Sequence, residues 1–374
     1  MTVPNEAGRH YPKLLGGRSL AEVATSTRDR AVQGVVHACY SAGEDFGSIR
    51  GRLLSTLRRV VSFDAAFMAT VDPDTLLFTS AFADDALAAS GPLFLDNEFG
   101  APADVNRFVD LARARNPVAS LDEVTKGERA ASARWREIMS PLGMGDELRV
   151  ALRVDETSWG FLCLHRCGAT GFDASEMAVL RKVAPHAGEA IRRVAVARSI
   201  ASGAIAERTD AVILVADHVV LAVAGAVEEI EGAPVVIGGP LPLPLAAVVR
   251  RLESIEGGSF DAPPATIRMT TKRGDLVAVH AARLRDLSGD GPVALTVAPA
   301  APAERSSLFL AAHGLTPAQR RVANLVLQGR TTGQIVVELR ISPHTVQDHL
   351  KAVFDKVGVR SRRELVSALM NPSH

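Results

Sequence analysis

Three side chains capable of metal-binding and redox chemistry lie at every second position near the middle of the sequence: Cys163, His165 and Cys167. On a β-strand, residues two apart project to the same face, so the two thiols and the imidazole could meet there. Thiolate and imidazole are good ligands for a metal such as zinc. A spacing of two is not the usual zinc pattern, however, and no fourth ligand is evident. The favoured interpretation is therefore buried or half-buried side chains on a sheet strand, and we predict neither a metal nor another cofactor.

A second group of polar side chains lies on one side of a helix predicted near the C-terminus. Ser342 is a good N-cap for this helix, and Pro343 takes its first position. The polar side carries His344, Gln347, Asp348 and Lys351, and the apolar side carries Val346, Leu350, Val353, Phe354 and Val357. A helix that enters the major groove of DNA reaches base edges with outward side chains of its N-terminal half. The pattern is typical of a DNA-reading helix.

Neighbouring helices are marked by their own start and stop signals. Thr316 and Gln319 form a capping box for one helix, and Gly329 ends it. A second helix is expected from about Thr332, burying Ile335, Val336 and Leu339, with a short turn at Arg340 and Ile341. A fourth begins at a capping box made by Ser361 and Glu364 and carries Leu365, Leu369 and Met370. The sequence thus predicts four short helices in 314–374, with the reading helix third.

This arrangement resembles the helix-turn-helix of the LuxR/NarL family. The matching positions are Leu315, Thr316, Gly329, Ile335, Leu339, Ile341, Ser342, Thr345, Val346, His349, Lys356, Gly358 and Val359. The chain departs from the family at Gln319 and Arg321, where acidic residues are usual, at Val336 in place of alanine, and at Arg340, where glycine is frequent. A match at so many fixed positions is far more specific than a single short motif.

The resemblance implies double-stranded DNA as the partner and assigns roles to individual residues. Gln347 and Lys351 are expected to read bases, with Asp348 beside them and His344 on the same face. The residues expected to position the DNA backbone are Ser342, Thr345, His349, Arg360 and Arg362. His349 borders the apolar face, so simple packing is an alternative for it. A helical protein-interaction module with a solvated basic face is the alternative for the whole segment.

The charge distribution agrees with DNA binding through the C-terminal segment. The chain has no net charge, but 314–374 holds nine basic and four acidic residues, a balance of +5 against −5 for the remainder. A basic module on a mildly acidic body is the electrostatic footprint expected of a DNA-binding regulator. The N-terminus lacks the pattern of a signal peptide, and no apolar run reaches the roughly 20 residues that span a bilayer. We therefore expect a cytoplasmic protein without membrane contact.

The remaining chain predicts two α+β domains. We expect an N-terminal extension over 1–30 and an α+β domain over 31–200, which ends in a long helix that is interrupted or kinked at Pro185. A second α+β domain over 204–298, a linker over 299–313 and the helix-turn-helix over 314–374 follow. In the first domain, strands at 147–154 and 158–166 are joined by the turn 155–157. In the second, strands at 212–215 and 219–223 form a hairpin. The fold class is multidomain: α+β sensory domains followed by an all-α, four-helix DNA-binding domain.

The order of helices and strands in 31–200, with the strand start Trp159-Gly160-Phe161-Leu162, resembles a GAF domain, and 204–298 resembles a degenerate PAS-like domain. Such folds bind small molecules between sheet and helices. Candidate pocket residues are Phe67, Met68, Phe78, Phe82, Trp135, Met139 and Met144. Most residues chosen on apolar character alone should instead be plain core, because core and pocket share that character.

Enzyme classes find no support in the sequence. It has no G-x-x-x-x-G-K-[ST] phosphate loop, no G-x-S-x-G elbow and no G-x-G-x-x-G fingerprint, and it lacks the acidic cluster of a phosphate-accepting receiver.

The expected function is a one-component regulator, not an enzyme, in which a small molecule or partner acts on a homodimer that docks on two half-sites and contacts RNA polymerase. The helix at 173–200 and the face of Leu365, Leu369 and Met370 are candidate dimer surfaces or plain core. The alternative is regulation by protein contact, with the basic tail attaching to DNA non-specifically.

Overall fold

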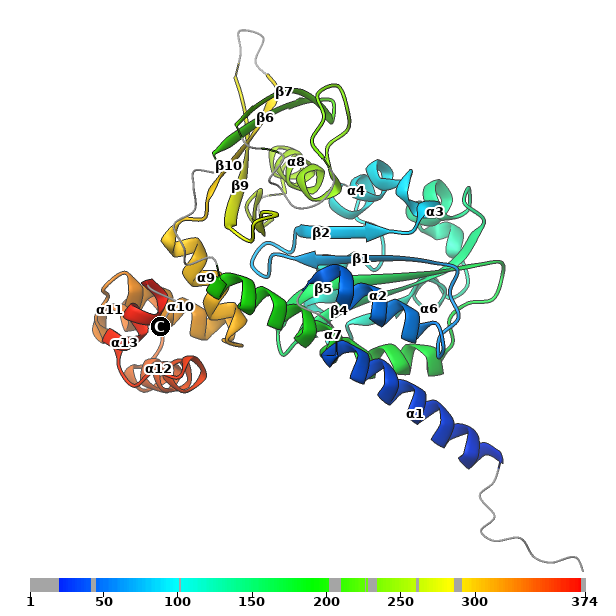
Figure 1. The fold of residues 1–374 in the computed structure, drawn as a ribbon, viewed down its shortest axis with the longest axis horizontal. Coiled ribbons are helices and arrows are strands. Elements are labelled where there is room, and N and C mark those ends of the chain that lie inside the picture. Colours follow the sequence, from blue (N-terminus) through cyan, green and yellow to red (C-terminus); the bar gives the residue numbers. More distant parts are fainter. Residues whose placement is uncertain are drawn as a thin grey trace, which may run out of the picture.

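The computed structural model describes residues 20–41, 45–100, 102–201, 210–225, 227, 234–259, 262–285 and 291–370. Two five-stranded sheets and a group of helices follow one another along the chain (Figure 1). We call residues 20–201 the first unit, 210–299 the second unit and 300–370 the C-terminal unit. Within these described ranges, no helix is both long and apolar enough to cross a bilayer.

The sheet of the first unit is antiparallel, with strand order β2-β1-β5-β4-β3. Its strands are β1 (Ala65–Val71), β2 (Phe78–Ala83), β3 (Val118–Ser120), β4 (Met144–Val154) and β5 (Thr157–Cys167). Helices cover both faces, so β4 and β5 are buried over most of their length, and their burial does not alternate. The predicted hairpin between these two strands is confirmed: Asp155 adopts a φ of 51°, and pairing runs outward from Val154 and Thr157.

Three helices lie on one face of this sheet. They are α1 (Leu20–Tyr40), α2 (Phe46–Leu57) and α7 (Ala174–Ala201), with α1 packed against the other two. The sequence predicts a kink or a break at Pro185, and the break is wrong, since α7 continues through Pro185 as one helix. Its neighbours Val183, Ala184 and Ala187 are almost fully buried, and this packing offsets the backbone hydrogen bond that proline cannot donate. The expected boundary at residue 30 falls inside α1, whereas residues 1–19 lie outside the described part.

The opposite face is covered by short helices that connect β2 to β4. These are α3 (Asp85–Ala88), α4 (Gly91–Phe99), α5 (Phe108–Arg113), α6 (Leu121–Thr125), the 3-10 turn η1 (Arg129–Ala131) and the π-helical turn η2 (Trp135–Met139). Phenylalanines dominate the core on this side: the rings of Phe108 and Phe161 stack with centroids 4.5 Å apart, and Phe67 meets Phe78 edge to face at 5.6 Å.

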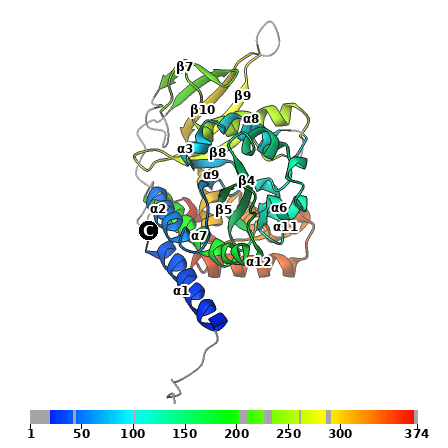
Figure 2. The same cartoon turned by 90° about the vertical axis from the view of Figure 1, so that its right-hand side faces the viewer.

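The second unit repeats the strand order of the first. Its sheet runs β7-β6-β10-β9-β8, so both units place their strands in the relative order 2-1-5-4-3. The elements are β6 (Ala211–Ala216), β7 (Val219–Gly225), α8 (Leu243–Glu256), β8 (Thr266–Thr270), β9 (Leu276–Arg283) and β10 (Val293–Pro299). The predicted hairpin β6–β7 is confirmed and turns at Asp217 and His218, which have φ of 49° and 61°. This unit lies over the β2 edge of the first sheet, where α8 contacts β2 and α4 (Figure 1, Figure 2).

The C-terminal unit contains five helices: α9 (Pro302–Ala312), α10 (Pro317–Leu327), α11 (Thr332–Leu339), α12 (Pro343–Val357) and α13 (Arg362–Met370). The segment expected to be a linker, 299–313, is therefore mostly helical. Pro302 takes a first-turn position in α9, where proline is favoured, and Leu308, Leu310 and Ala311 are buried against neighbouring helices. Because α9 contacts both α7 and α10, it docks the C-terminal unit on the first unit.

The caps predicted for three of the last four helices, α10, α12 and α13, are confirmed. The hydroxyls of Thr316 and Ser342 accept hydrogen bonds from the backbone N–H groups of Gln319 and Thr345, and that of Ser361 accepts one from Glu364. Arg340, where the resembled family frequently has glycine, ends α11 with φ 54° and ψ 42°. That left-handed conformation is unfavourable for a residue with a Cβ atom, which explains why glycine suits this turn.

Replacing Arg340 with glycine should stabilise the turn between α11 and α12 by about 1 kcal/mol, because glycine adopts the left-handed conformation without steric cost. Hydrogen–deuterium exchange of peptides from α11 and α12, measured in the full chain, tests this stabilisation. Exchange in these peptides should be slower in Arg340→Gly than in the wild-type chain. Gly358→Ala is the matched control, since Gly358 has φ 78° and ends α12. It should speed exchange, and faster exchange in Arg340→Gly would contradict the strain argument.

Candidate functional site: a reading helix, a buried cavity and the junction between units

Helix α12 presents a polar face to solvent and an apolar face to the core of the C-terminal unit. Val346, Leu350 and Val353 are buried in that core. Gln347 and Lys351, which are predicted to read bases, are exposed, and so are Asp348 and His344 on the same face. Nε2 of His344 lies 3.6 Å from Oδ2 of Asp348, one helical turn away. The described structure thus brings the predicted reading residues together on one accessible face.

The residues predicted to position the DNA backbone are less uniform. Ser342 and Thr345 form the cap of α12, and His349 is half-buried, as its alternative assignment anticipates. Arg360 is exposed, but the guanidinium of Arg362 donates to the carbonyl of Arg330 at 3.0 Å and to Oγ1 of Thr332 at 2.8 Å. Arg362 therefore ties α13 to the start of α11 in this structure. Its side chain has an internal structural role that spacing alone did not reveal.

A cavity of about 230 Å³ lies within the first unit, between the sheet and the short helices. Its walls are apolar, and its floor is a group of polar and charged side chains from η2, β4 and β5. The lining includes Phe67, Leu87, Phe94, Ile138, Met139 and Leu243 on the apolar side and Arg134, Glu147, Arg149, Cys163 and His165 on the polar side. Leu243 comes from the start of α8, so the second unit closes part of this cavity.

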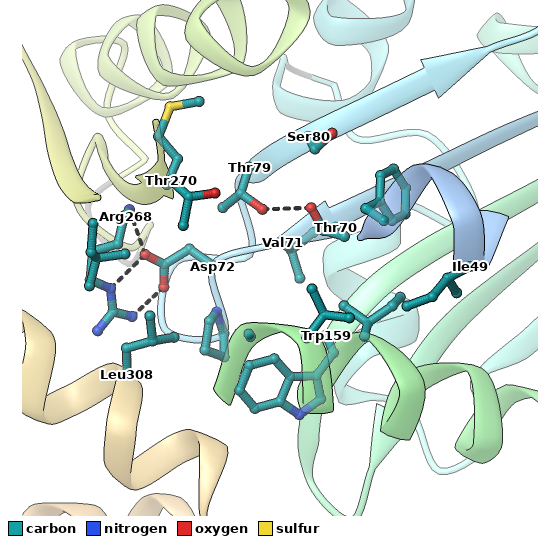
Figure 3. A pocket seen from close by; sticks show the side chains of 17 residues that line it. Ile49, Thr70, Val71, Asp72, Thr79, Ser80, Trp159, Arg268, Thr270 and Leu308 are labelled. Atoms are coloured by element: carbon teal, nitrogen blue, oxygen red, sulfur yellow. Dashed lines mark hydrogen bonds and ion pairs between the residues drawn. The ribbon is translucent and has the colours of Figure 1, made fainter. Parts of the chain in front are cut away.

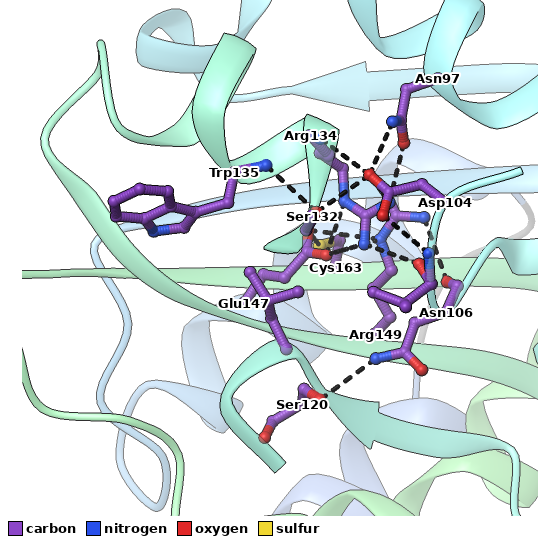
Figure 4. Close-up of polar contacts among 12 residues, drawn as sticks. Asn97, Asp104, Asn106, Ser120, Ser132, Arg134, Trp135, Glu147, Arg149 and Cys163 are labelled. Carbon is purple, nitrogen blue, oxygen red and sulfur yellow. Dashed lines mark hydrogen bonds and ion pairs between the residues drawn. The ribbon is translucent and has the colours of Figure 1, made fainter. Parts of the chain in front are cut away.

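The polar floor is a continuous network of buried ion pairs and hydrogen bonds (Figure 4). The two oxygens of Glu147 accept from Nε of Arg134 at 2.7 Å and from Nε of Arg149 at 3.3 Å. Nη1 of Arg149 also donates to Glu98 at 2.9 Å, and Asp104 accepts from the backbone N–H of Arg134 at 2.7 Å. Both guanidiniums are at most 2% exposed. Charges so deeply buried are tolerated only when paired, which this network achieves.

This environment shifts the ionisation of the residues on the floor. Burial is the largest influence on Glu147, but the nearby guanidiniums of Arg134 and Arg149 outweigh it and hold its pKa well below the usual range. Burial lowers the pKa of His165 to about 4, and it raises the pKa of the Cys163 thiol far above its ordinary value. At neutral pH the floor therefore has a charged carboxylate, a neutral imidazole and a protonated thiol.

The predicted pocket residues are distributed over both sides of the sheet. Phe67 and Met139 line the cavity. Phe78, Trp135 and Met144 belong to the core on the same side without lining it, and the indole N–H of Trp135 donates to the carbonyl of Gly145. Met68 and Phe82 pack on the opposite side, towards α2 and α7. The charged floor was missed because it combines three separate segments: Arg134, the alternating pair Glu147 and Arg149 on β4, and the pair Cys163 and His165 on β5. Only the register between β4 and β5 brings the two pairs together.

Cys163 and His165 do share one face of β5, as strand alternation predicts, and Sγ of Cys163 lies 3.3 Å from Nε2 of His165. Glu147 completes a group of three donor atoms within 4.8 Å of one another, whereas Cys167 is exposed. The carboxylate of Glu147 already accepts from two guanidiniums, and their positive charges oppose a metal cation. This donor set fits a hydrogen-bonded cluster better than a metal site.

A second site joins all three units at the turn between β1 and β2 (Figure 3). Oδ2 of Asp72 accepts from Nε of Arg268 on β8 at 2.8 Å and from its backbone N–H at 2.9 Å. Asp74, two residues on, accepts from Arg268 at 2.7 Å, from Arg320 on α10 at 2.7 Å and from the hydroxyl of Ser307 on α9 at 2.6 Å. Partial desolvation at the junction tends to raise the pKa of Asp74, but the guanidiniums of Arg268 and Arg320 outweigh it and lower this pKa. A cavity of about 90 Å³ lies beside this junction.

The C-terminal unit, with its capped helices and exposed α12 face, is a helix-turn-helix module. The model of the family described as bacterial regulatory proteins, luxR family, matches residues 313–369. Spore germination protein GerE of Bacillus subtilis (strain 168) is 39% identical over 56 residues, covering 15% of this chain and 76% of GerE. The chain belongs to the LuxR family of bacterial regulatory proteins.

Other relatives share the same segment. HTH-type transcriptional regulators of Mycobacterium bovis and Mycobacterium tuberculosis are 46% identical over 52 residues, which cover 14% of this chain. The match spans only 6% of the length of those mycobacterial proteins. A GAF domain model matches residues 48–191, which include the sheet and most of the helices around the larger cavity. The expected GAF-like domain is thereby confirmed.

Solved structures resemble the chain only loosely. Escherichia coli SdiA is 10% identical, with 94% of this chain and 98% of SdiA covered at a TM-score of 0.32. The VqsR LBD domain from Pseudomonas aeruginosa is 14% identical, covering 45% of this chain and 96% of that domain at a TM-score of 0.30. TM-scores of this size do not establish a shared overall fold.

Removing Arg149 should strongly destabilise the first unit, because Glu98 and Glu147 would remain buried without their cation. We expect Arg149→Met to lower the free energy of unfolding by about 3–5 kcal/mol, measured by urea denaturation with a probe in the first unit. Lys182→Met is the matched control: its ion pair with Asp29 is exposed at both ends, so the loss should stay below about 1 kcal/mol. Equal effects would show that the buried network does not stabilise the fold.

Removing Asp74 should loosen the docking of the C-terminal unit, because Arg320, Ser307 and Arg268 would each lose a bond. Cleavage by chymotrypsin within α9, which contains Phe309, should become several-fold faster in Asp74→Ala. Asp85→Ala removes a carboxylate at the exposed start of α3 and should leave the rate unchanged. An unchanged rate in Asp74→Ala would mean that the apolar contacts of α9 suffice for docking.

Proposed function

We propose that this protein is a sequence-specific DNA-binding transcription regulator of the one-component kind, in which the first unit senses a signal and the C-terminal unit binds DNA. The observation that supports this most directly is the exposed face of α12, a capped helix with Gln347 and Asp348 in its N-terminal half and Lys351 one turn after Gln347. Side chains in this position reach base edges when such a helix lies in the major groove.

We further propose that a small molecule in the larger cavity controls DNA binding. The cavity is enclosed between the sheet and helices of the GAF-like domain, and Leu243 of α8 closes part of it. A continuous series of contacts leads from there to the DNA-binding unit: the second unit supplies Arg268, Arg268 binds Asp72 and Asp74, and Asp74 binds Arg320 on α10. A ligand with different affinities for docked and undocked forms would shift their populations.

The second unit fits the proposal of a degenerate PAS-like domain. Its sheet has the same strand order as the sheet of the GAF-like domain, with one long helix, α8, against one face. The second unit lies between the larger cavity and the junction at Asp72 and Asp74, a position that suits a role in transmitting ligand binding to the DNA-binding unit. The cavity of about 230 Å³ takes only Leu243 from this unit.

Binding to two half-sites requires a homodimer, which we retain as part of the proposal. Leu365 and Leu369 are buried in the core of the C-terminal unit, so this face of α13 is not free to form the dimer surface. The apolar stripe of α7 likewise packs on the sheet of the first unit and includes Leu180, Val183 and Ala187. The dimer surface must therefore use other residues.

The reading assignment predicts a specific loss of affinity. After selection of preferred sites from random duplexes, Gln347→Ala and Lys351→Ala should each weaken binding to the selected operator by about 1–3 kcal/mol and weaken binding to random DNA much less. Footprinting and gel-shift titration at fixed salt provide the measurement. Lys182→Ala removes one positive charge from the first unit and should leave both affinities unchanged.

Equal losses on operator and random DNA would assign Gln347 and Lys351 to the backbone only. Failure to select any preferred sequence would favour the alternative function, in which the protein regulates by protein contact and the basic segment binds DNA without specificity.

A further inference from the structure

The larger cavity defines the chemistry of the molecule that it can accept. We propose that it binds a small, uncharged and mainly apolar molecule with one hydroxyl group, and that this hydroxyl forms a hydrogen bond with Nδ1 of His165. The inference rests on the proposed control of DNA binding by a small molecule and specifies the ligand class for that site.

The free nitrogen of His165 is the observation that points to a ligand. The side chain is 6% exposed and lies on the cavity floor, and Nδ1 has no hydrogen-bond partner within the described residues. This nitrogen has almost no accessible surface in the structure, so a ligand reaches it when the imidazole turns toward the cavity. Leaving a buried polar atom unpaired is costly, and a ligand group that pairs with it gains that bond. Because Nε2 already meets Sγ of Cys163, Nδ1 is the nitrogen left for a ligand.

A hydroxyl suits this nitrogen better than a group that only donates or only accepts. The thiol of Cys163 is protonated and lies near two acceptors, Nε2 of His165 at 3.3 Å and Oε2 of Glu147 at 3.5 Å. If the thiol donates to the imidazole, Nδ1 carries the proton and donates. If it donates to Glu147, Nδ1 becomes an acceptor. A hydroxyl both donates and accepts, so it pairs with either tautomer.

The charge balance of the floor excludes an ionised ligand. The guanidiniums of Arg134 and Arg149 face three carboxylates, those of Glu98, Asp104 and Glu147. No positive charge is left over for an anion. A cation finds no free carboxylate in the cavity lining, because Glu147, the carboxylate that lines it, already accepts from both guanidiniums, whose positive charges repel a cation. Burying an ion without a partner is strongly unfavourable, whereas an uncharged molecule leaves the network intact.

The volume and walls set the size and polarity of the ligand. A dry protein cavity of about 150 Å³ accommodates benzene, and drug-sized ligands fill about 300–1,000 Å³. The cavity here, about 230 Å³, fits one ring with a short substituent or an aliphatic chain of similar bulk. Phe67, Phe94 and Met139 provide aromatic and thioether walls for such a group.

Three probes of similar size separate the chemistries: phenol, toluene and benzoate. Isothermal titration of the full chain at neutral pH should show phenol binding with a dissociation constant in the micromolar to low millimolar range, toluene binding about 10-fold more weakly, and no benzoate binding. The 10-fold ratio corresponds to about 1.4 kcal/mol, the usual range for one hydrogen bond.

Variants in the protein test the location. Ala83→Leu fills space in the cavity and should abolish phenol binding. Phe82→Leu is the matched control on the same strand, since Phe82 packs on the opposite side of the sheet, and it should bind phenol normally. His165→Leu should reduce the phenol preference over toluene to about one, and His165→Asn, which keeps a polar group near the Nδ1 position, should restore part of it.

Equal affinities for phenol and toluene in the wild-type chain, tighter binding of benzoate, or binding that survives Ala83→Leu would overturn the inference, as would no binding of any probe. Operator footprinting of the same proteins tests the proposed function separately. A specific footprint without probe binding removes this ligand class and leaves the DNA-binding function standing. If phenol binding depends on Ala83 and His165 but no specific footprint is found, the ligand class stands and the proposed sequence-specific DNA binding is removed.

Discussion

The ion pair between Asp72 and Arg268 is the constraint on which the arrangement of the three units depends. Its two members are 196 residues apart, and both are almost completely buried. Burying two charges costs more free energy than a single contact returns, unless further bonds satisfy the remaining polar atoms. Here Asp72 also accepts a backbone N–H, and Arg268 also donates to Asp74 and to the carbonyl of Glu304. The pair is thus satisfied only when the first unit, the second unit and α9 are in place together.

Local signals made the C-terminal unit predictable from sequence. A cap such as Thr316 or Ser342 acts within three residues, and Gly358 ends α12 through a conformation that few other residues adopt, so each boundary is written in neighbouring residues. The hairpins β4–β5 and β6–β7 were predictable for the same reason. The exposed reading face follows directly from helical periodicity once those boundaries are known.

The buried floor of the cavity and the junction could not be predicted in this way. Glu98 and Arg149 are 51 residues apart, and their meeting depends on how α4 packs over β4. Strand alternation placed Cys163 and His165 on one face of β5. The register between β4 and β5 sets Arg149 opposite Cys163 and Glu147 opposite His165, and only this register brings Glu147 to them. Helix α9 was mistaken for a linker because its proline and alanine content suits both a semi-rigid connection and the start of a helix.

The short connection before helix α9 also affects how strongly the C-terminal unit must bind the first unit to stay docked. It connects the C-terminal unit to β10 with only residues 300 and 301 between them, so an undocked unit would remain within a few nanometres of its docking surface. Short connections of this kind give effective concentrations in the millimolar range. The junction contacts together then need a dissociation constant only below the millimolar range to keep most molecules docked, and a half-exposed pair such as Asp74 and Arg320, which contributes about 1 kcal/mol or less, adjusts that balance. A modest free-energy difference that arises elsewhere in the chain can accordingly shift the balance between docked and undocked molecules.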